Sequence, residues 1–204
     1  MRFATITDRL QGLGADKWAV HFRGRELLAA GHDIIELTIG EPDIPPHEGL
    51  VEATVAALRA GRTRYSGGHG EIGLRRAIAA RYAARTGRDI DPDQVLCLPG
   101  TQSALFAAMM TLAEAGDEVA IADPYYATYE GVVRSTGATV RPIPTRAGDG
   151  FRLTPAAFEA ALTPAVKVLL LNSPHNPSGG GVGPPKRGPQ TPQRAPPRRR
   201  GINA

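Results

Sequence analysis

Short apolar segments alternate with helix-forming segments from residue 94 onward, and this alternation constrains the fold more than any other feature of the chain. The apolar runs are QVLCL, DEVAIAD, ATVRPIP and AVKVLLLN, and a stretch with helix-forming character separates each from the next. Short strands that are apolar on both faces and alternate with helices are typical of parallel sheets. We therefore expect an α/β fold, a mostly parallel sheet covered by helices.

The N-terminal part predicts a helical and strand segment that precedes this regular pattern. Helices are expected over residues 16–31, 46–60 and 74–86, where apolar residues recur at helical spacing or glycine marks a helix end. A strand is expected over residues 33–40, DIIELTIG, which ends at a glycine.

The last 25 residues differ from the rest in composition and charge. They contain six prolines, five glycines and no apolar periodicity, so we expect residues 180–204 to be a disordered tail. The tail holds six of the 24 basic residues and none of the 20 acidic ones, so residues 1–179 carry 18 basic and 20 acidic residues, a net charge of −2. The basic pI of the chain therefore comes from the tail, and nucleic acid is an unlikely partner for the remainder.

Targeting and cysteine usage favour a cytoplasmic protein. No run of about 18 apolar residues is present, so no membrane span is expected. The first residues, MRFATITDRLQGLG, lack the apolar segment of a signal peptide. The single cysteine, Cys97, excludes a disulfide framework and fits a reducing compartment.

Ligands of parallel sheets bind beyond the carboxyl ends of the strands, so the residues that follow each strand are candidate site residues. Gly100 and Thr101 open a helix after VLCL, where free N–H groups can hold a phosphate, although an ordinary capped helix start fits equally. Tyrosines at 125, 126 and 129 follow EVAIAD and can stack on a planar ligand or pack in the core. Asn176 follows VLLLN and can donate an amide hydrogen bond or serve as a turn residue.

Two further patterns predict no additional site. Residues 68–73 fit G-x-G-x-x-G, but the polar stretch GRTRYS precedes them, whereas a dinucleotide fingerprint follows a buried strand. The five histidines show no ligand spacing with cysteine or carboxylates, so no metal site is expected.

Five motifs together resemble the class I/II aminotransferases, the pyridoxal-phosphate enzymes of fold type I. They are LTIGEPD, RYSGGHGEIGLRRAIA, LPGTQSALFAAMM, GDEVAIADPYYATYEG and NSPHNPSG, and they occur in this order between residues 34 and 179. The resemblance implies transfer of an amino group from an amino acid to a 2-oxo acid with pyridoxal 5'-phosphate as cofactor. Such a cofactor acts as an electron sink while the protein orients it.

The resemblance also assigns roles to individual positions. Gly100, Thr101 and Gln102 match the loop that binds the cofactor phosphate. Tyr126 matches the aromatic residue that stacks on the pyridine ring, with Tyr125 as a weaker match. Asn176 matches the asparagine that hydrogen-bonds the phenolic oxygen of the cofactor.

Three further positions follow from the same resemblance. Tyr65 matches a tyrosine that reaches the phosphate in the partner subunit, so the site implies a homodimer. Gly40 matches the glycine beside the substrate carboxylate. Pro124 and Pro177 match prolines often preceded by cis peptide bonds.

The resemblance divides the chain into three parts. Residues 1–45 correspond to an N-terminal arm and part of a small domain, and residues 46–179 to a partial cofactor-binding large domain. Residues 180–204 have no counterpart, and a shifted reading frame is the simplest account of them.

The family's catalytic residues have no match here. Its Schiff-base lysine, pyridine-binding aspartate and carboxylate-binding arginine are expected after the NP motif, and Lys17, Lys167 and Lys186 stand in other contexts. The sequence therefore predicts a truncated aminotransferase that is inactive alone. The alternative is a non-enzymatic protein whose basic tail binds nucleic acid or an acidic partner.

Overall fold

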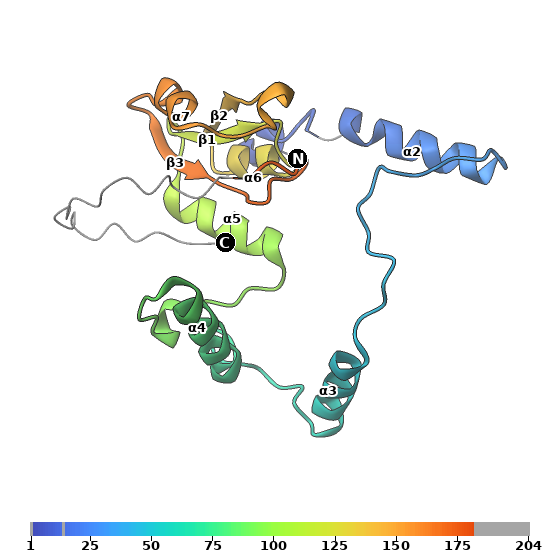
Figure 1. The fold of residues 1–204 in the computed structure, drawn as a ribbon, viewed down its shortest axis with the longest axis vertical. Coiled ribbons are helices and arrows are strands. Elements are labelled where there is room, and N and C mark those ends of the chain that lie inside the picture. Colours follow the sequence, from blue (N-terminus) through green and yellow to red (C-terminus); the bar gives the residue numbers. More distant parts are fainter. Residues whose placement is uncertain (1, 14, 182–204) are drawn as a thin grey trace. The chain divides into compact units, whose positions relative to one another are not determined.

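A computed structural model describes residues 2–13 and 15–181, which form two compact units (Figure 1). One unit comprises Met1–Ala19 and Leu105–Ala204, and the other comprises Val20–Ala104. The domain boundaries predicted at residues 45 and 179 come from the resemblance to a family, not from the contacts that define these two units. Those boundaries therefore stay a prediction. The predicted tail lies outside the described residues from residue 182 onward.

The first unit is built on a three-stranded parallel sheet, as expected. Strands β1 (Glu118–Asp123), β2 (Thr139–Pro144) and β3 (Val166–Leu170) are arranged in the order β2-β1-β3. β1 lies in the centre and pairs in parallel with both neighbours. Its inner four residues are buried, which explains why this strand is apolar on both faces.

Helices cover both faces of the sheet. On one face, Val119 and Ile121 of β1 pack with Leu105 and Met109 of α5 (Thr101–Leu112) and with Val133 of α6 (Tyr129–Ser135). The opposite face packs against α7 (Pro155–Ala161), through the buried residues Ala120, Ile143 and Ala161. Figure 1 shows α5 and α7 on opposite sides of the strands. The predicted α/β architecture is therefore confirmed.

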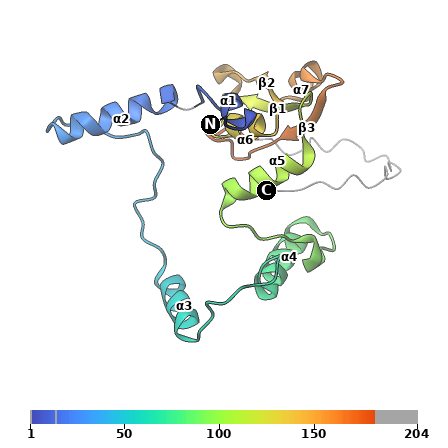
Figure 2. The same cartoon turned by 180° about the vertical axis from the view of Figure 1, so that it is seen from behind.

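A short N-terminal helix joins this unit through one arginine. Figure 2 shows α1 (Thr5–Arg9) beside α6. The Arg9 guanidinium donates hydrogen bonds to the carbonyls of Arg134 and Ser135, at 3.1 and 3.0 Å. These carbonyls belong to the last turn of α6, where a cation satisfies acceptors that lack a helical partner.

The second unit contains helices and loops. Helix α2 (Ala15–Ala29) enters it, and α3 (Glu48–Arg59) and α4 (Ile72–Thr86) follow. The buried Arg75 of α4 holds the 3-10 turn at Pro92–Gln94: its guanidinium donates to the carbonyls of Pro92 and Val95 and to the Asp93 carboxylate. A second short 3-10 turn, at Ala147–Asp149, belongs to the first unit.

Two predicted strands, residues 33–40 and QVLCL at 94–98, are wrong for the described structure. A strand requires a hydrogen-bonded neighbour. Ile35 and Leu37 of the first segment are 85% and 88% exposed, although the run is apolar. In the second segment, the Cys97 N–H donates to the carbonyl of His69 in a loop, rather than to a strand.

None of the helices in the described ranges is both long enough and apolar enough to span a bilayer. Among the same residues, no group of three or more histidine, cysteine or acidic side chains could hold a metal ion.

Candidate functional site

The carboxyl ends of β1 and β3 lie at one edge of the sheet because the two strands run in parallel. Two loops leave this edge. One runs from Pro124 to Thr128, before α6, and the other is a hook formed by residues 172–180. The first loop carries Tyr126, which is predicted to stack on the pyridine ring of the cofactor. The second carries Asn176, which is predicted to hydrogen-bond the phenolic oxygen of the cofactor.

The tyrosines that follow β1 differ in how much of each side chain is exposed. The Tyr126 ring lies edge-on to the Tyr129 ring, with 5.5 Å between centroids and an interplanar angle of 75°. Tyr126 is 37% exposed, whereas Tyr129 is 6% exposed and belongs to the core. Tyr125 packs against that core, so Tyr126 is the tyrosine of the predicted pair that has a ring accessible to a ligand.

The hook after β3 is closed by its own hydrogen bonds. The His175 N–H donates to the Gly180 carbonyl and the Gly179 N–H donates to the His175 carbonyl, both at 2.7 Å. The His175 Nδ1 atom lies 2.9 Å from the Ser178 hydroxyl oxygen. At Gly180 a Cβ atom would lie 2.7 Å from the Phe151 carbonyl oxygen, so the close approach requires glycine there.

The peptide bonds that precede Pro124 and Pro177 are cis, which confirms the prediction for both positions. A third cis bond precedes Pro174, and the sequence reasoning did not anticipate it.

Asn172 and Tyr129 lie beside the two predicted contact residues. The Asn172 Oδ1 atom accepts the Asn176 N–H at 2.8 Å, and the Asn172 side chain lies near enough to the Tyr129 phenol to affect its pKa. Burial raises the pKa of the Tyr129 phenol above its usual 10.0, and the neighbouring Tyr126 raises this pKa further, while the bond with Asn172 lowers it. Tyr126 thus contacts Tyr129, and Asn176 contacts Asn172, in the two segments that leave this edge of the sheet.

Sequence reasoning named Tyr129 only as one of three tyrosines after EVAIAD and did not name Asn172. The position of Asn172 was visible, because it directly follows the apolar run LLL. The two residues are 43 positions apart, so no local pattern reveals their proximity.

The predicted phosphate loop lies in the other unit. Gly100 has φ +84°, a left-handed conformation that favours glycine, and α5 begins at the next residue, Thr101. The first N–H groups of a helix lack intrahelical partners, so the backbone at Thr101 and Gln102 presents the donors that a phosphate needs. A Cβ atom at Gly100 would meet nothing within 4 Å, so the space beside this loop is open.

Tyr65 and Gly40 also lie in this unit, and both are exposed. Within the described residues of this unit, no hydrogen bond or ion pair joins either of them to Gly100 or Thr101. A hollow of about 350 Å³ lies near Gly40, lined by His21, Arg25, Glu36, Ile39 and Glu41. His21 Nδ1 lies 2.8 Å from the Thr38 hydroxyl oxygen and 3.0 Å from a Glu36 carboxylate oxygen, so these polar groups already satisfy one another.

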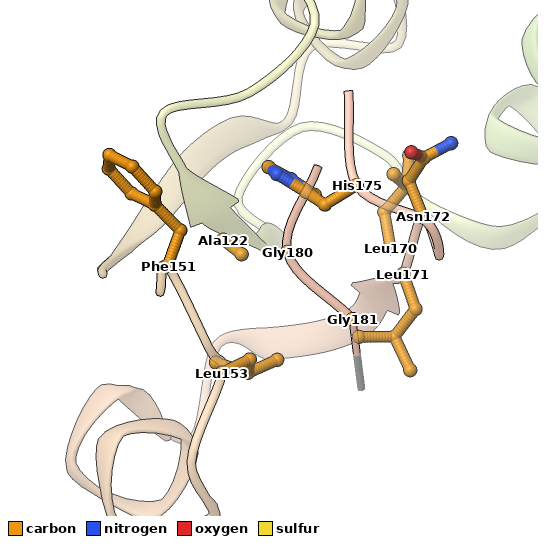
Figure 3. Close-up of a pocket in the computed structure, with 9 residues that line it drawn as sticks. All are labelled: Ala122, Phe151, Leu153, Leu170, Leu171, Asn172, His175, Gly180 and Gly181. Atoms are coloured by element: carbon orange, nitrogen blue, oxygen red, sulfur yellow. The ribbon is translucent and has the colours of Figure 1, made fainter. Parts of the chain in front are cut away.

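A second hollow adjoins the hook but does not fit a cofactor. Figure 3 shows it between Phe151, Leu153 and the hook, with the Asn172 amide pointing away from Phe151 and Leu153. Its volume is about 10 Å³, room for about one water molecule. Tyr126 and Asn176 do not line this hollow, and both are exposed.

Lys167 does not belong to this edge. It lies at the amino end of β3, and its Nζ atom is 3.4 Å from the Asp117 carboxylate, which precedes β1. Lys17 lies in α2, in a segment whose side chains the structure does not describe, and Lys186 lies outside the described residues.

Comparison with known proteins identifies the family. The sequence signature of the family described as "Aminotransferase class I and II" matches residues 32–184. Arginine–pyruvate transaminase AruH of Pseudomonas aeruginosa is 40% identical over 182 residues, which cover 89% of this chain and 46% of that protein. The aspartate/prephenate aminotransferase of Cereibacter sphaeroides is 40% identical over 163 residues, which cover 79% of this chain and 40% of that protein.

Solved structures agree with the sequence matches. The aspartate aminotransferase of Thermus thermophilus with maleate superposes with a TM-score of 0.81 at 33% identity, over 90% of this chain and 48% of that one. An alanine aminotransferase from Pyrococcus furiosus superposes with a TM-score of 0.82 at 28% identity, over 89% of this chain and 46% of that one. The chain spans about half the length of the relatives that it matches, and it belongs to the class I and II aminotransferase family.

Proposed function

We propose that this chain carries the cofactor-anchoring residues of a pyridoxal-phosphate-dependent aminotransferase. The phosphate is held by Gly100, Thr101 and Gln102 at the start of α5. The ring stacks on Tyr126, and the Asn176 amide donates to the phenolic oxygen. The observation that carries the proposal is that the exposed residues Tyr126 and Asn176 follow the parallel strands β1 and β3 at one edge of the sheet, in a chain of this family.

The chemistry of these groups suits the cofactor. Backbone N–H groups at a helix start bind a dianionic phosphate, an accessible aromatic ring stacks on a planar heterocycle, and an amide donates to an oxyanion. Among the described residues the Asn176 side chain makes no hydrogen bond, so its amide is available to a ligand. The bound cofactor would supply an electron sink for the transfer of an amino group from an amino acid to a 2-oxo acid.

Two further roles complete the proposal. Gly40 lies beside the substrate carboxylate, and Tyr65 reaches the phosphate of a partner subunit in a cytoplasmic homodimer. The full exposure of the Tyr65 side chain supports a contact outside its own unit. Residues 46–179 then form part of the cofactor-binding large domain.

The residues named above bind the cofactor, but none of them can transfer a proton at the substrate as a catalytic lysine would. In the described structure Lys167 is paired with Asp117 at the amino end of the sheet, away from the loops that carry Tyr126 and Asn176. We propose that the 204-residue chain binds the cofactor without a covalent lysine bond and is inactive alone. The alternative, a basic tail that binds nucleic acid, concerns residues outside the described part.

Equilibrium dialysis of the chain against pyridoxal 5'-phosphate tests the anchoring residues. We expect saturable binding that Tyr126→Ala and Asn176→Ala each weaken about three- to tenfold, the equivalent of one stacking or hydrogen-bond contact. Phe3→Ala, which removes an exposed ring far along the chain, is the matched control and should bind as the unchanged chain does.

Two results would contradict the proposal. One is the absence of saturable binding. The other is a one-to-one adduct on Lys17, Lys167 or Lys186 after borohydride reduction of the saturated chain, because such an adduct would place a lysine at the cofactor aldehyde.

A further inference from the structure

Helix α3 (Glu48–Arg59) is amphipathic, yet it buries none of its residues. Its large apolar side chains recur at helical spacing along one side of the helix, at Leu50, Val51, Val55 and Leu58. These side chains are 65%, 43%, 37% and 57% exposed, in that order. An apolar stripe of this kind normally packs against another element, so this stripe, the α3 face, is a candidate docking surface.

The charged residues of α3 indicate what binds there. Glu48 and Glu52 lie in the first half of the helix, and Arg59 is its last residue. At about 100° per residue, these three side chains fall along the same edge of the α3 face. All three are exposed, and none of them takes part in an ion pair within the part of the chain that the structure describes. Their charges are therefore available to a neighbouring molecule.

This charge pattern is self-complementary. When two copies of one helix pack antiparallel about a two-fold axis, the same edge of each stripe faces the other, and the start of one helix lies beside the end of the other. With the axis at the middle of α3, Arg59 of one copy lies between Glu48 and Glu52 of the other, and symmetry forms the contact twice. Leu58 of one copy then packs against Val51 of the other.

We propose that the α3 face binds a second copy of this chain, with the two helices antiparallel. The inference rests on the homodimer of the proposed function and names a surface that holds it together. Tyr65 stands six positions after the end of α3 and is fully exposed. Six residues span at most about 20 Å, so docking of α3 keeps Tyr65, the residue proposed to reach the phosphate of the partner subunit, near the second copy.

The strength expected of this contact is modest. Two helices of 12 residues offer less than the about 1,200 Å² that stable interfaces bury. Ion pairs at the rim of an interface fix the orientation of the partners more than they add affinity. We therefore expect a dimer that dissociates in the micromolar range.

Sedimentation velocity of the 204-residue chain at rising concentration tests the proposal. We expect the mean mass to rise from that of one chain to that of two between about 1 and 100 μM. Leu58→Asp places a charge within the α3 face and should weaken association more than about tenfold, because that charge would be buried without a partner. Ala56→Asp, at an exposed position on the opposite side of the same helix, is the matched control and should associate as the unchanged chain does.

Charge reversal tests the antiparallel arrangement itself. Glu52→Arg and Arg59→Glu should each weaken self-association about three- to tenfold, because each places like charges beside one another at both ends of the contact. An equimolar mixture of the two variants should associate at least about threefold more tightly than either variant does with itself, since opposite charges then meet again. A parallel helix pair would not show this rescue, because the charged edge of one helix would face an edge that carries alanine.

The outcomes separate this inference from the proposed function. A chain that stays a monomer up to about 100 μM overturns the inference and the proposed homodimer together. A dimer that Leu58→Asp leaves intact, or a mixture of the charge variants without rescue, overturns the inference alone. If circular dichroism shows that Leu58→Asp does not fold, the variants at the exposed Glu52 and Arg59 decide the result. Binding of pyridoxal 5'-phosphate is measured separately by dialysis, so failure of the anchoring residues is distinguishable from failure of the α3 face.

Discussion

The two compact units bury their apolar residues very differently. In the unit with the sheet, Ile121 and Ile143 are 1% and 0% exposed and lie on opposite faces of the sheet. In the unit of residues 20–104, Ile35 and Leu37 are 85% and 88% exposed, and its buried described residues are Arg75 and Ala79.

This difference shows that an apolar run can become a buried strand or can stay exposed without a partner strand. The run that becomes β1 has strands on both sides and helices on both faces, so its side chains are removed from water within one unit. The run at residues 33–40 has no paired strand in the described structure, and its Ile35 and Leu37 side chains stay exposed. Local pattern determines the backbone tendency, whereas the neighbours determine whether a strand forms.

The largest effect should come from the centre of the sheet. Ile121→Ala leaves a cavity between α5 and α6 and should lower the free energy of unfolding by about 2–5 kcal/mol. The matched variant Ile35→Ala should change it by less than about 0.5 kcal/mol, because that side chain is already in water. Urea unfolding followed by circular dichroism measures both, and equal effects would remove the contrast between the units.

Arg75 should be the most sensitive position of the other unit. Arg75→Met leaves the carbonyls of Pro92 and Val95 without their donor, at a cost of about 1–3 kcal/mol. We expect faster hydrogen exchange at the Cys97 amide, which lies in the segment that Arg75 holds. Arg76→Met changes an exposed neighbour on the same helix and is the control. Equal hydrogen exchange at the Cys97 amide in both variants would show that the hydrogen bonds of Arg75 do not stabilise this segment.

Removing the N-cap of one helix in each unit should have a smaller effect on the free energy of unfolding. The Thr154 hydroxyl accepts the Ala157 N–H at 3.1 Å at the start of α7, and the His47 Nδ1 atom accepts the Gly49 N–H at 3.0 Å at the start of α3. Thr154→Ala should lower the free energy of unfolding by about 1 kcal/mol. His47→Ala should leave the urea transition of the sheet unchanged, because α3 has no buried residue. A shift of this transition by His47→Ala would contradict the separation of the units.

The smallest effect concerns pH. Burial raises the pKa of Tyr129 in the folded chain above the 10.0 of the unfolded chain. Above pH 10 the folded state then binds more protons at Tyr129 than the unfolded state does, so the contribution of Tyr129 to stability is fully present below pH 10 and is lost as pH rises through the folded pKa. Tyr129→Phe should flatten this fall in urea unfolding at stepped pH. Tyr65→Phe, at a fully exposed tyrosine, should not, and an equal change in both would contradict the assignment.

Sequence reasoning succeeded where a segment is determined by its own residues. The run DEVAIAD predicts β1, and the helix-forming stretch between ATVRPIP and AVKVLLLN contains α7. It failed at residues 33–40 and 94–98, because alternation of apolar residues does not say whether a partner strand is present.

The individual site residues could be predicted from the sequence, but the contacts between residues far apart in the chain could not. Tyr126 and Asn176 stand directly after strands, so topology places them at one edge of the sheet. The proximity of Tyr129 and Asn172 depends on tertiary packing, because Tyr129 is a buried core residue at the start of α6 and Asn172 lies 43 positions further along the chain. Such a contact between distant positions has no signature in either loop alone.

The most direct test of the account compares the binding of pyridoxal 5'-phosphate with that of pyridoxal, which lacks the phosphate, to the same chain by equilibrium dialysis. The account predicts saturable one-to-one binding of the phosphorylated form. Pyridoxal should bind more than about tenfold more weakly, because it loses the charge-assisted hydrogen bonds at the start of α5. Equal affinity for the two compounds, or no saturation with either, would contradict the claim that this chain anchors the cofactor.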